Sequence, residues 1–367
     1  MNITKEQVLD ALKNVIDPDL KKDIVSLGLV SGIEIKEMEI SFKLRISNPA
    51  LHNKKRMEQA CEFNLERFIS SDVEADIEIS GIGSEETDPN LRKILPGVKN
   101  IIAVASGKGG VGKSTVTANL AVSLAKKGYK VGLVDADIYG PSMPLMLDCA
   151  FEKPTMVEVD GKNYIAPVET YGVKLMSIGF FADLNQAIVW RGAMASKAIK
   201  QMFMDTYWGE LDYMLIDLPP GTGDVHLTLV QLVPISGAVI VSTPQEIALA
   251  DVKKGIHMFK MPNINVPVLG IIENMSYFTP AELPDNKYYI FGKEGAKNLC
   301  EQLDVKLLGE IPLVQDIREA GDAGKPIATV DGSPSAIAFD LISANVIEQL
   351  NWRHKNLDPT KVVKMTQ

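Results

Sequence analysis

The sequence of 367 residues has few cysteines and no long apolar run. Its three cysteines, Cys61, Cys149 and Cys300, lie far apart and form no paired framework, which argues against a disulfide-stabilised fold and fits a reducing compartment. No stretch approaches the roughly 20 apolar residues of a membrane-spanning helix, and the opening segment MNITKEQVLD lacks the regions of a signal peptide. We therefore expect a cytoplasmic protein with no membrane partner.

An excess of basic residues is also absent. The chain has 38 Lys and Arg against 47 Asp and Glu, so its net charge is -9 and its pI is about 5.2. Proteins that capture DNA or RNA through electrostatics usually present a basic face, so no nucleic-acid partner is expected. The hydrophobic content of 46% is sufficient for ordinary cores, and the length allows two domains.

The most informative motif lies at residues 107–114, which read GKGGVGKS and satisfy the phosphate-loop pattern G-x-x-x-x-G-K-S/T. Its glycines let successive backbone N–H groups converge on phosphate oxygens, and the following helix presents its positive N-terminal end to the same charge. Lys113 supplies a cation for the terminal phosphates, and the Ser114 hydroxyl suits a magnesium shell. The flanking residues predict a buried strand at Val98–Ala105 and an amphipathic helix at Ser114–Lys127.

The first 85 residues are predicted to form a small α+β domain. Thr4 and Gln7 have the spacing of a capping box at the start of a helix, and a second helix is expected over residues 51–69. Alternating apolar residues predict strands at Leu29–Ile35, Met38–Ile46 and Val73–Ile79. The order is αββαβ, followed by a linker over residues 86–97 that shows no sustained period.

From residue 98 to residue 350, apolar strands alternate with helices, which predicts a doubly wound, mostly parallel α/β sheet. The last helix is expected over Pro334–Leu350, with a tail over residues 351–367. The predicted strands are Ile101–Ala105, Lys130–Val134, Lys174–Ile178, Tyr213–Ile216, Gly237–Ser242, Val268–Ile272 and Lys306–Gly309.

Polar residues follow three of these strands, at the sheet edge where ligands bind in such folds. After the second strand come Asp135 and Asp137, of which one can position a water, although either can also cap a loop. Asp217 ends a later strand and precedes a glycine-rich turn; we expect it to hold magnesium, through the metal's water shell, beside a turn that senses the γ-phosphate. Asn274 can read an adenine edge or can simply form a turn.

Together these motifs resemble a known family. Lys108 within GKGGVGKST, with DADIYGPS at 135–142 and DLPPGTGD at 217–224, is similar to the deviant Walker A ATPases. With ENMS at 273–276 and the N-terminal αββαβ unit, nearly the whole chain resembles the Mrp/ApbC iron–sulfur cluster carrier proteins. The segment at 17–30, DPDLKKDIVSLGLV, resembles the small domain of metal–sulfur assembly factors.

The resemblance implies a homodimeric, magnesium-dependent ATPase that serves apo-iron–sulfur proteins or assembly factors, with an iron–sulfur cluster as cargo. Lys108 of one subunit would reach the phosphates held by the other, Asp137 would orient the attacking water, and Asn274 would recognise the base. The implied catalytic residues are Lys108, Lys113 and Asp137, and the implied magnesium residues are Ser114, Asp135 and Asp217. The implied nucleotide-binding residues are Gly107, Lys108, Gly109, Gly110, Val111, Gly112, Lys113, Ser114, Thr115 and Asn274.

The chain departs from the family pattern in its cysteines. Family members that carry a cluster usually place a C-x-x-C pair shortly after ENMS, whereas residues 277–284 here read YFTPAELP. Relatives often have a further cysteine in the small domain, where residues 47–52 read SNPALH; His52 there is more typical of a solvated helix start than of a ligand. Four thiolates normally hold a cluster, so its ligands in this chain are unknown and direct binding is not expected from the sequence.

The sequence fits two other functions less well. A MinD/ParA-like positioning or partition ATPase needs a basic surface or an amphipathic anchor, but the apolar face of the last helix (Ile337, Leu341, Ala344, Ile347) is more typical of core packing. An interaction scaffold with a degenerate site is disfavoured, because every expected phosphate and magnesium residue is present.

Overall fold

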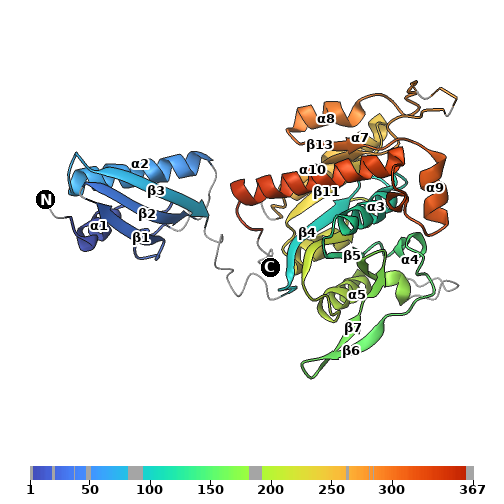
Figure 1. Ribbon diagram of the computed structural model, residues 1–367, viewed down its shortest axis with the longest axis horizontal. Coiled ribbons are helices and arrows are strands. Elements are labelled where there is room, and N and C mark those ends of the chain that lie inside the picture. Colours follow the sequence, from blue (N-terminus) through green and yellow to red (C-terminus); the bar gives the residue numbers. More distant parts are fainter. Residues whose placement is uncertain are drawn as a thin grey trace. The chain divides into compact units, whose positions relative to one another are not determined.

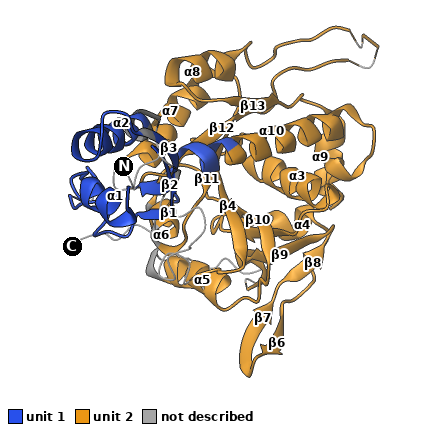
Figure 2. Ribbon diagram, turned by 60° about the vertical axis from the view of Figure 1, so that its left-hand side comes forward, with its two compact units in different colours: residues 1–90, 352–359 blue, residues 91–351, 360–367 orange. Residues whose placement is uncertain are grey.

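The computed structural model describes residues 3–18, 21–36, 38–46, 51–81, 94–181, 192–261, 264–280, 282–283 and 285–360. Its contacts divide the chain into two compact units, residues 1–90 with 352–359 and residues 91–351 with 360–367 (Figure 2). Most of the predicted linker, the segment 47–50 and the end of the predicted tail lie outside the described residues.

The first unit is the predicted αββαβ arrangement. The capping box at its start is present: the Gln7 N–H donates to Thr4 Oγ1 at 3.3 Å, and the Thr4 N–H donates to Gln7 Oε1 at 2.9 Å. Strand β1 pairs antiparallel with β2, and β2 pairs parallel with β3. Alternate residues of β2 are buried in a separate core, as its pattern predicted. The elements are α1 (Lys5–Leu12), β1 (Val30–Lys36), β2 (Glu39–Ile46), α2 (Leu51–Phe68) and β3 (Glu74–Gly81).

The second unit is built on an eight-stranded sheet in the order β13-β12-β11-β4-β10-β5-β9-β8, most of whose strands are labelled in Figure 2. All neighbouring strands run parallel except β8, which pairs antiparallel with β9 at one edge, so the predicted doubly wound, mostly parallel sheet is confirmed. Its strands are β4 (Val98–Ala105), β5 (Val131–Asp135), β8 (Val168–Thr170), β9 (Val173–Ser177), β10 (Leu211–Asp217), β11 (Gly237–Ser242), β12 (Val268–Glu273) and β13 (Leu307–Glu310).

The connections run in two directions from β4, which lies inside the sheet. One leads through α3 to β5, whereas those that pass through α6, α7 and α8 lead towards β13; because such crossovers are right-handed, helices cover both faces. On one face α3 and α10 lie side by side, and their Ser123 and Ser343 hydroxyls are 3.0 Å apart (Figure 1). The helices are α3 (Lys113–Lys126), α4 (Met143–Met146), α5 (Gly192–Met204), α6 (Asp224–Leu232), α7 (Glu246–Lys260), α8 (Gly295–Leu303), α9 (Gln315–Asp322) and α10 (Pro334–Asn356).

Three features differ from the sequence-based prediction, and one of them is the short antiparallel edge strand β8, which was not predicted. An antiparallel hairpin, β6 (Thr155–Val159) and β7 (Lys162–Ala166), was not predicted; its residues are half-buried or exposed, so they give only a weak apolar pattern. Helix α10 runs to Asn356 and therefore includes the first part of the predicted tail, because no proline or glycine interrupts the chain before Pro359. In the part of the chain that the structure describes, no helix has the length and apolarity to cross a membrane.

Candidate nucleotide site

The phosphate loop and the predicted acids converge because three strands are neighbours. Strand β10 lies between β4 and β5, and its last residue, Asp217, is in register with Val104 of β4 and with Asp135 of β5. The loop leaves the carboxyl end of β4 directly beside them. Residues 100 positions apart in sequence are thus brought to one edge of the sheet, as expected for parallel strands.

The glycines of the loop are required by its backbone. Gly110 and Gly112 both have φ of +81°, a conformation that side-chain-bearing residues rarely adopt. A Cβ at Gly112 would collide with the side-chain nitrogen of Asn274, and a Cβ at Gly107 would collide with the backbone of Asp251. Helix α3 begins immediately after the loop, so its unpaired N–H groups are available to an anion.

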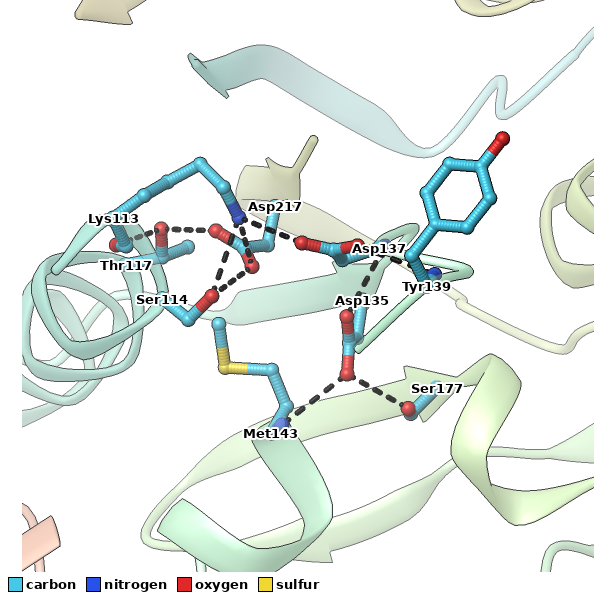
Figure 3. A network of polar contacts seen from close by, with 9 residues as sticks. All are labelled: Lys113, Ser114, Thr117, Asp135, Asp137, Tyr139, Met143, Ser177 and Asp217. Atoms are coloured by element: carbon cyan, nitrogen blue, oxygen red, sulfur yellow. Dashed lines mark hydrogen bonds and ion pairs between the residues drawn. The ribbon is translucent and has the colours of Figure 1, made fainter. Parts of the chain in front are cut away.

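Lys113 is the centre of a buried polar network (Figure 3). Its ammonium, on a side chain only 6% exposed, donates to Asp217 Oδ2 at 2.7 Å and lies 3.6 Å from Asp137 Oδ2. The Ser114 hydroxyl also donates to Asp217 Oδ2, and the Thr117 hydroxyl donates to Asp217 Oδ1, each at 2.7 Å. Burial raises the pKa of Asp217, and the Lys113 charge and these hydrogen bonds oppose that rise. Thr117 was not predicted, although it lies one helical turn after Lys113.

Asp135 is fully buried and organises the chain around it. Its Oδ2 accepts hydrogen bonds from the Ser177 hydroxyl at 2.9 Å and from the Met143 N–H at 3.2 Å (Figure 3). Its Oδ1 accepts from the Asp137 N–H at 3.3 Å, so Asp135 sets the position of the second acid. Burial, followed by the negative charge of Asp217, raises the pKa of Asp135 to about 7.

Asp137 and its neighbour Tyr139 face different surroundings. One carboxylate oxygen of Asp137 faces Lys113, and the other accepts from the Tyr139 N–H at 3.3 Å. The Tyr139 ring points away from the network (Figure 3) and is 78% exposed. Asp137 is itself 8% exposed, whereas Asp135 and Asp217 are fully buried, so it is the acid of the three that lies nearest to solvent.

Asn274 and Lys108 occupy opposite environments. The buried side chain of Asn274 donates from Nδ2 to the Val111 carbonyl at 2.8 Å, so it anchors the phosphate loop to the end of β12. Lys108 is exposed, and no hydrogen bond or ion pair holds it within the described residues. Of the predicted residues, the structure gathers Lys113, Ser114, Asp135, Asp137 and Asp217 into one network and leaves Lys108 outside it.

With this geometry in view, a family model described as the NUBPL iron-transfer P-loop NTPase matches residues 97–347. The chain belongs to this family. A second model, described as an iron–sulfur cluster assembly protein, matches residues 5–77. The resemblance seen in the motifs is therefore confirmed for both parts of the chain.

Individual relatives agree with the family assignment. The chain is 41% identical over 345 residues to an iron–sulfur cluster carrier protein of Synechocystis sp., covering 94% of this chain and 97% of the relative. It is 50% identical over 262 residues to an iron–sulfur cluster carrier protein of Aquifex aeolicus, covering 71% and 70%. Among solved structures, a nucleotide-binding protein of Archaeoglobus fulgidus in complex with ADP is 40% identical, with a TM-score of 0.58 over 69% of this chain and 96% of that one.

The donor set of this NTPase fits a nucleotide with magnesium. Mg²⁺ is usually held by one or two carboxylates together with phosphate oxygens, and Ser114 and Asp217 already meet at 2.7 Å beside the loop. The glycine-rich turn is tied to the same place, since the Gly221 N–H donates to the Ser106 carbonyl at 2.9 Å. Within the described ranges, no group of three or more His, Cys, Asp or Glu side chains is placed to hold a metal alone.

The segment after ENMS, which lacks the cysteine pair, is organised by other contacts. Phe278 and Tyr288 exchange two backbone hydrogen bonds of 2.8 Å, and the Lys287 ammonium lies 3.9 Å from the centre of the Tyr277 ring. The cysteines that the chain does have, Cys61, Cys149 and Cys300, are all buried, and burial raises the pKa of each thiol to about 12. Since metals bind the thiolate, none of the three is prepared as a ligand in this conformation.

Proposed function

We propose that this P-loop NTPase is a magnesium-dependent ATPase of iron–sulfur cluster assembly that works as a homodimer. The single observation that carries the ATPase is the contact of Lys113, Ser114 and Asp217 beneath the phosphate loop. These are the groups that bind terminal phosphates and magnesium in such sites, and Lys113 and Ser114 each lie 2.7 Å from the Asp217 carboxylate.

The network suggests how the residues act. The Lys113 ammonium neutralises the two buried acids Asp217 and Asp137. ATP offers Lys113 a stronger set of anionic partners, so the ammonium turns to the β- and γ-phosphates and Asp217 and Ser114 become available to Mg²⁺. Mg²⁺ held there by Ser114 and Asp217 would supply charge neutralisation to the phosphate oxygens. Asp137, at the boundary of the network, orients the attacking water, and Asp135 holds Asp137 through its backbone N–H.

Lys108 supports a dimer. A lysine of the phosphate loop that has no partner within the described residues is available to phosphates bound by a second subunit. Hydrolysis would then wait for two loaded subunits to close, which couples ATP to conformation and to exchange of partners.

The cargo is inferred from the family. The relatives are named for carrying or transferring iron–sulfur clusters, and the N-terminal unit matches a model of cluster-assembly proteins. Because the three thiols are buried and protonated, we infer that the chain acts on clusters together with ligands from a client or an assembly partner.

The ATPase is tested by phosphate release from the purified full-length chain. We expect Lys113→Ala to lower turnover by at least about 100-fold, since it removes the charge that faces the phosphates. Lys108→Ala should lower turnover comparably while ATP still binds, and its ATP-bound form should no longer dimerise in sedimentation. Wild-type turnover in Lys113→Ala, with an unchanged melting temperature, would refute the site.

The cargo is tested by anaerobic reconstitution with iron and sulfide, followed by visible absorption and iron counting. We expect little retained iron on the chain alone, and ATP-dependent activation of an apo-iron–sulfur enzyme when a cluster donor is added. Stable iron on wild type that the three Cys→Ala variants lose would show instead that the chain supplies its own thiolates. Absence of any ATP effect on cluster insertion would contradict the assembly function.

A further inference from the structure

His226 is a buried histidine next to the site that the mechanism above does not use. It lies in the first turn of α6, directly after the glycine-rich turn that follows Asp217. The residue is only 2% exposed, yet neither ring nitrogen makes a hydrogen bond to any described residue. Leaving a buried polar group unpaired destabilises the folded state, so an unpaired ring at this place calls for a physical reason.

The charges around the ring are those of the nucleotide site. The pKa of His226 is lowered to about 4, mainly by burial and also by the charge of Lys113, whereas the Gly223 carbonyl and Asp137 oppose the fall. The Gly223 carbonyl therefore influences the pKa of the ring, although it forms no hydrogen bond with either ring nitrogen. The ring is therefore neutral at physiological pH, with one N–H donor and one acceptor nitrogen, and neither is committed.

The contacts of Lys113 indicate when these groups would gain a partner. Lys113 is the cation that faces Asp137, at 3.6 Å, and this cation is the one that ATP recruits. Once Lys113 has turned to the phosphates, Asp137 loses its counter-charge while the His226 N–H still has no acceptor. The intervening turn contains Gly221 at φ +90°, a backbone with the freedom to reorient α6 when the phosphates bind.

We propose that His226 is a positioning residue for ATP hydrolysis, whose neutral ring donates a hydrogen bond to the Asp137 carboxylate when ATP draws Lys113 away. The inference rests on the proposed ATPase. In this arrangement His226 takes over from Lys113 in orienting Asp137, and thus the attacking water, without adding a charge beside the γ-phosphate. Because His226 follows the glycine-rich turn directly, this hydrogen bond also couples the conformation of the turn to the orientation of Asp137.

The kinetic test compares His226→Leu and His226→Gln with wild type. We expect His226→Leu to lower kcat by about 10- to 100-fold, the range for loss of a positioning contact, with KM and the dissociation constant for a fluorescent ATP analogue changed less than about 3-fold. Its melting temperature should be equal or higher, because leucine leaves no unpaired nitrogen. His226→Gln, which keeps a donor, should recover part of kcat. His257→Gln changes an exposed histidine of α7 and serves as the matched control.

The outcomes separate this inference from the ATPase itself. Wild-type chain that does not hydrolyse ATP overturns both. Hydrolysis by wild type with an unchanged kcat in His226→Leu overturns only the inference and makes His226 a packing residue. If His226→Leu melts lower than wild type, kcat of His226→Gln decides the question, since a packing residue would show no recovery.

A spectroscopic test needs no turnover. The chain has four histidines, so ¹⁵N-histidine labelling gives few ring signals, and the one missing from His226→Gln is that of His226. We expect a non-hydrolysable ATP analogue with Mg²⁺ to shift this signal and to slow exchange of its N–H proton, and we expect Asp137→Ala to abolish the change. A His226 signal that nucleotide leaves unchanged would overturn the proposal.

Discussion

Two acids in the second unit occupy equivalent places in the fold but differ in what they can do. Asp217 ends β10 and Glu273 ends β12, both at the carboxyl edge of the same parallel sheet and both essentially inaccessible to solvent. Burial raises the pKa of each. A strand-end acid in an open α/β sheet is by itself a reasonable site candidate, so position alone does not separate them.

Their partners separate them. Glu273 accepts from the Ser276 hydroxyl at 2.5 Å and from the Ala296 N–H at 2.6 Å, a backbone group at the start of α8 that nothing else satisfies. Asp217 is instead held by the ammonium of Lys113 and by side-chain hydroxyls of the same helix. The flexible side chain of a lysine can move from one anion to another, whereas a backbone N–H at a helix N-terminus is fixed in place and keeps the acid that it binds. We infer that a buried carboxylate is available to a ligand only where its present partner can bind a different group instead.

The strongest test of this comparison is Asp217→Asn. We expect ATP turnover to fall about 100-fold and the magnesium concentration for half-maximal turnover to rise about 10- to 100-fold, because the neutral amide is a poor substitute in a metal shell. Steady-state phosphate release over a magnesium titration measures both. If Asp217→Asn had the magnesium dependence of wild type, Asp217 would not be a magnesium residue and would not differ from Glu273 in this respect.

The matching change at the other acid is Glu273→Met, which keeps the side-chain length. We expect the free energy of unfolding to fall by about 1–3 kcal/mol, because the Ala296 N–H and the Ser276 hydroxyl lose their acceptor. Turnover should stay within about 3-fold of wild type. Denaturant unfolding measures the change in stability, and phosphate release measures turnover. A large loss of turnover at wild-type stability would instead assign Glu273 to the nucleotide site.

The most gradual expected effect concerns Asp135 and is spread over several pH units. Its carboxyl keeps a proton to about pH 7 in the folded chain but loses it near its usual pKa of 3.8 when unfolded. Unfolding between these values releases a proton, so this contribution to stability is present in acid and is lost as pH rises from about 4 to about 7.

We therefore expect the stability of wild type relative to Asp135→Asn to decrease over that interval by at most about 1.4 kcal/mol per pH unit. Denaturant unfolding without nucleotide or magnesium measures the difference. A difference that does not vary with pH would mean that Asp135 is ionised throughout and that Lys113, rather than the proton, balances its charge.

Much of the fold was predictable because its signals are local. The capping box of α1, the alternation in β2 and the apolar strands of the large sheet each depend on residues close in sequence. The half-exposed hairpin β6–β7 escaped prediction because its periodicity is weak. The partners Ser177 and Thr117 escaped because a lone hydroxyl gives no signal until the strand or helix beside it is known.

The sequence by itself determined the chemistry of the phosphate loop, since a contiguous run of glycines, a lysine and a serine specifies a backbone cradle wherever it occurs. Only the tertiary structure decided which acid that lysine meets. The strand order β4-β10-β5 places Asp217 beneath the loop, whereas β12 ends at a helix N-terminus that occupies Glu273. It also left His226 buried without a partner. Contacts between distant segments depend on topology and burial, which no local pattern records.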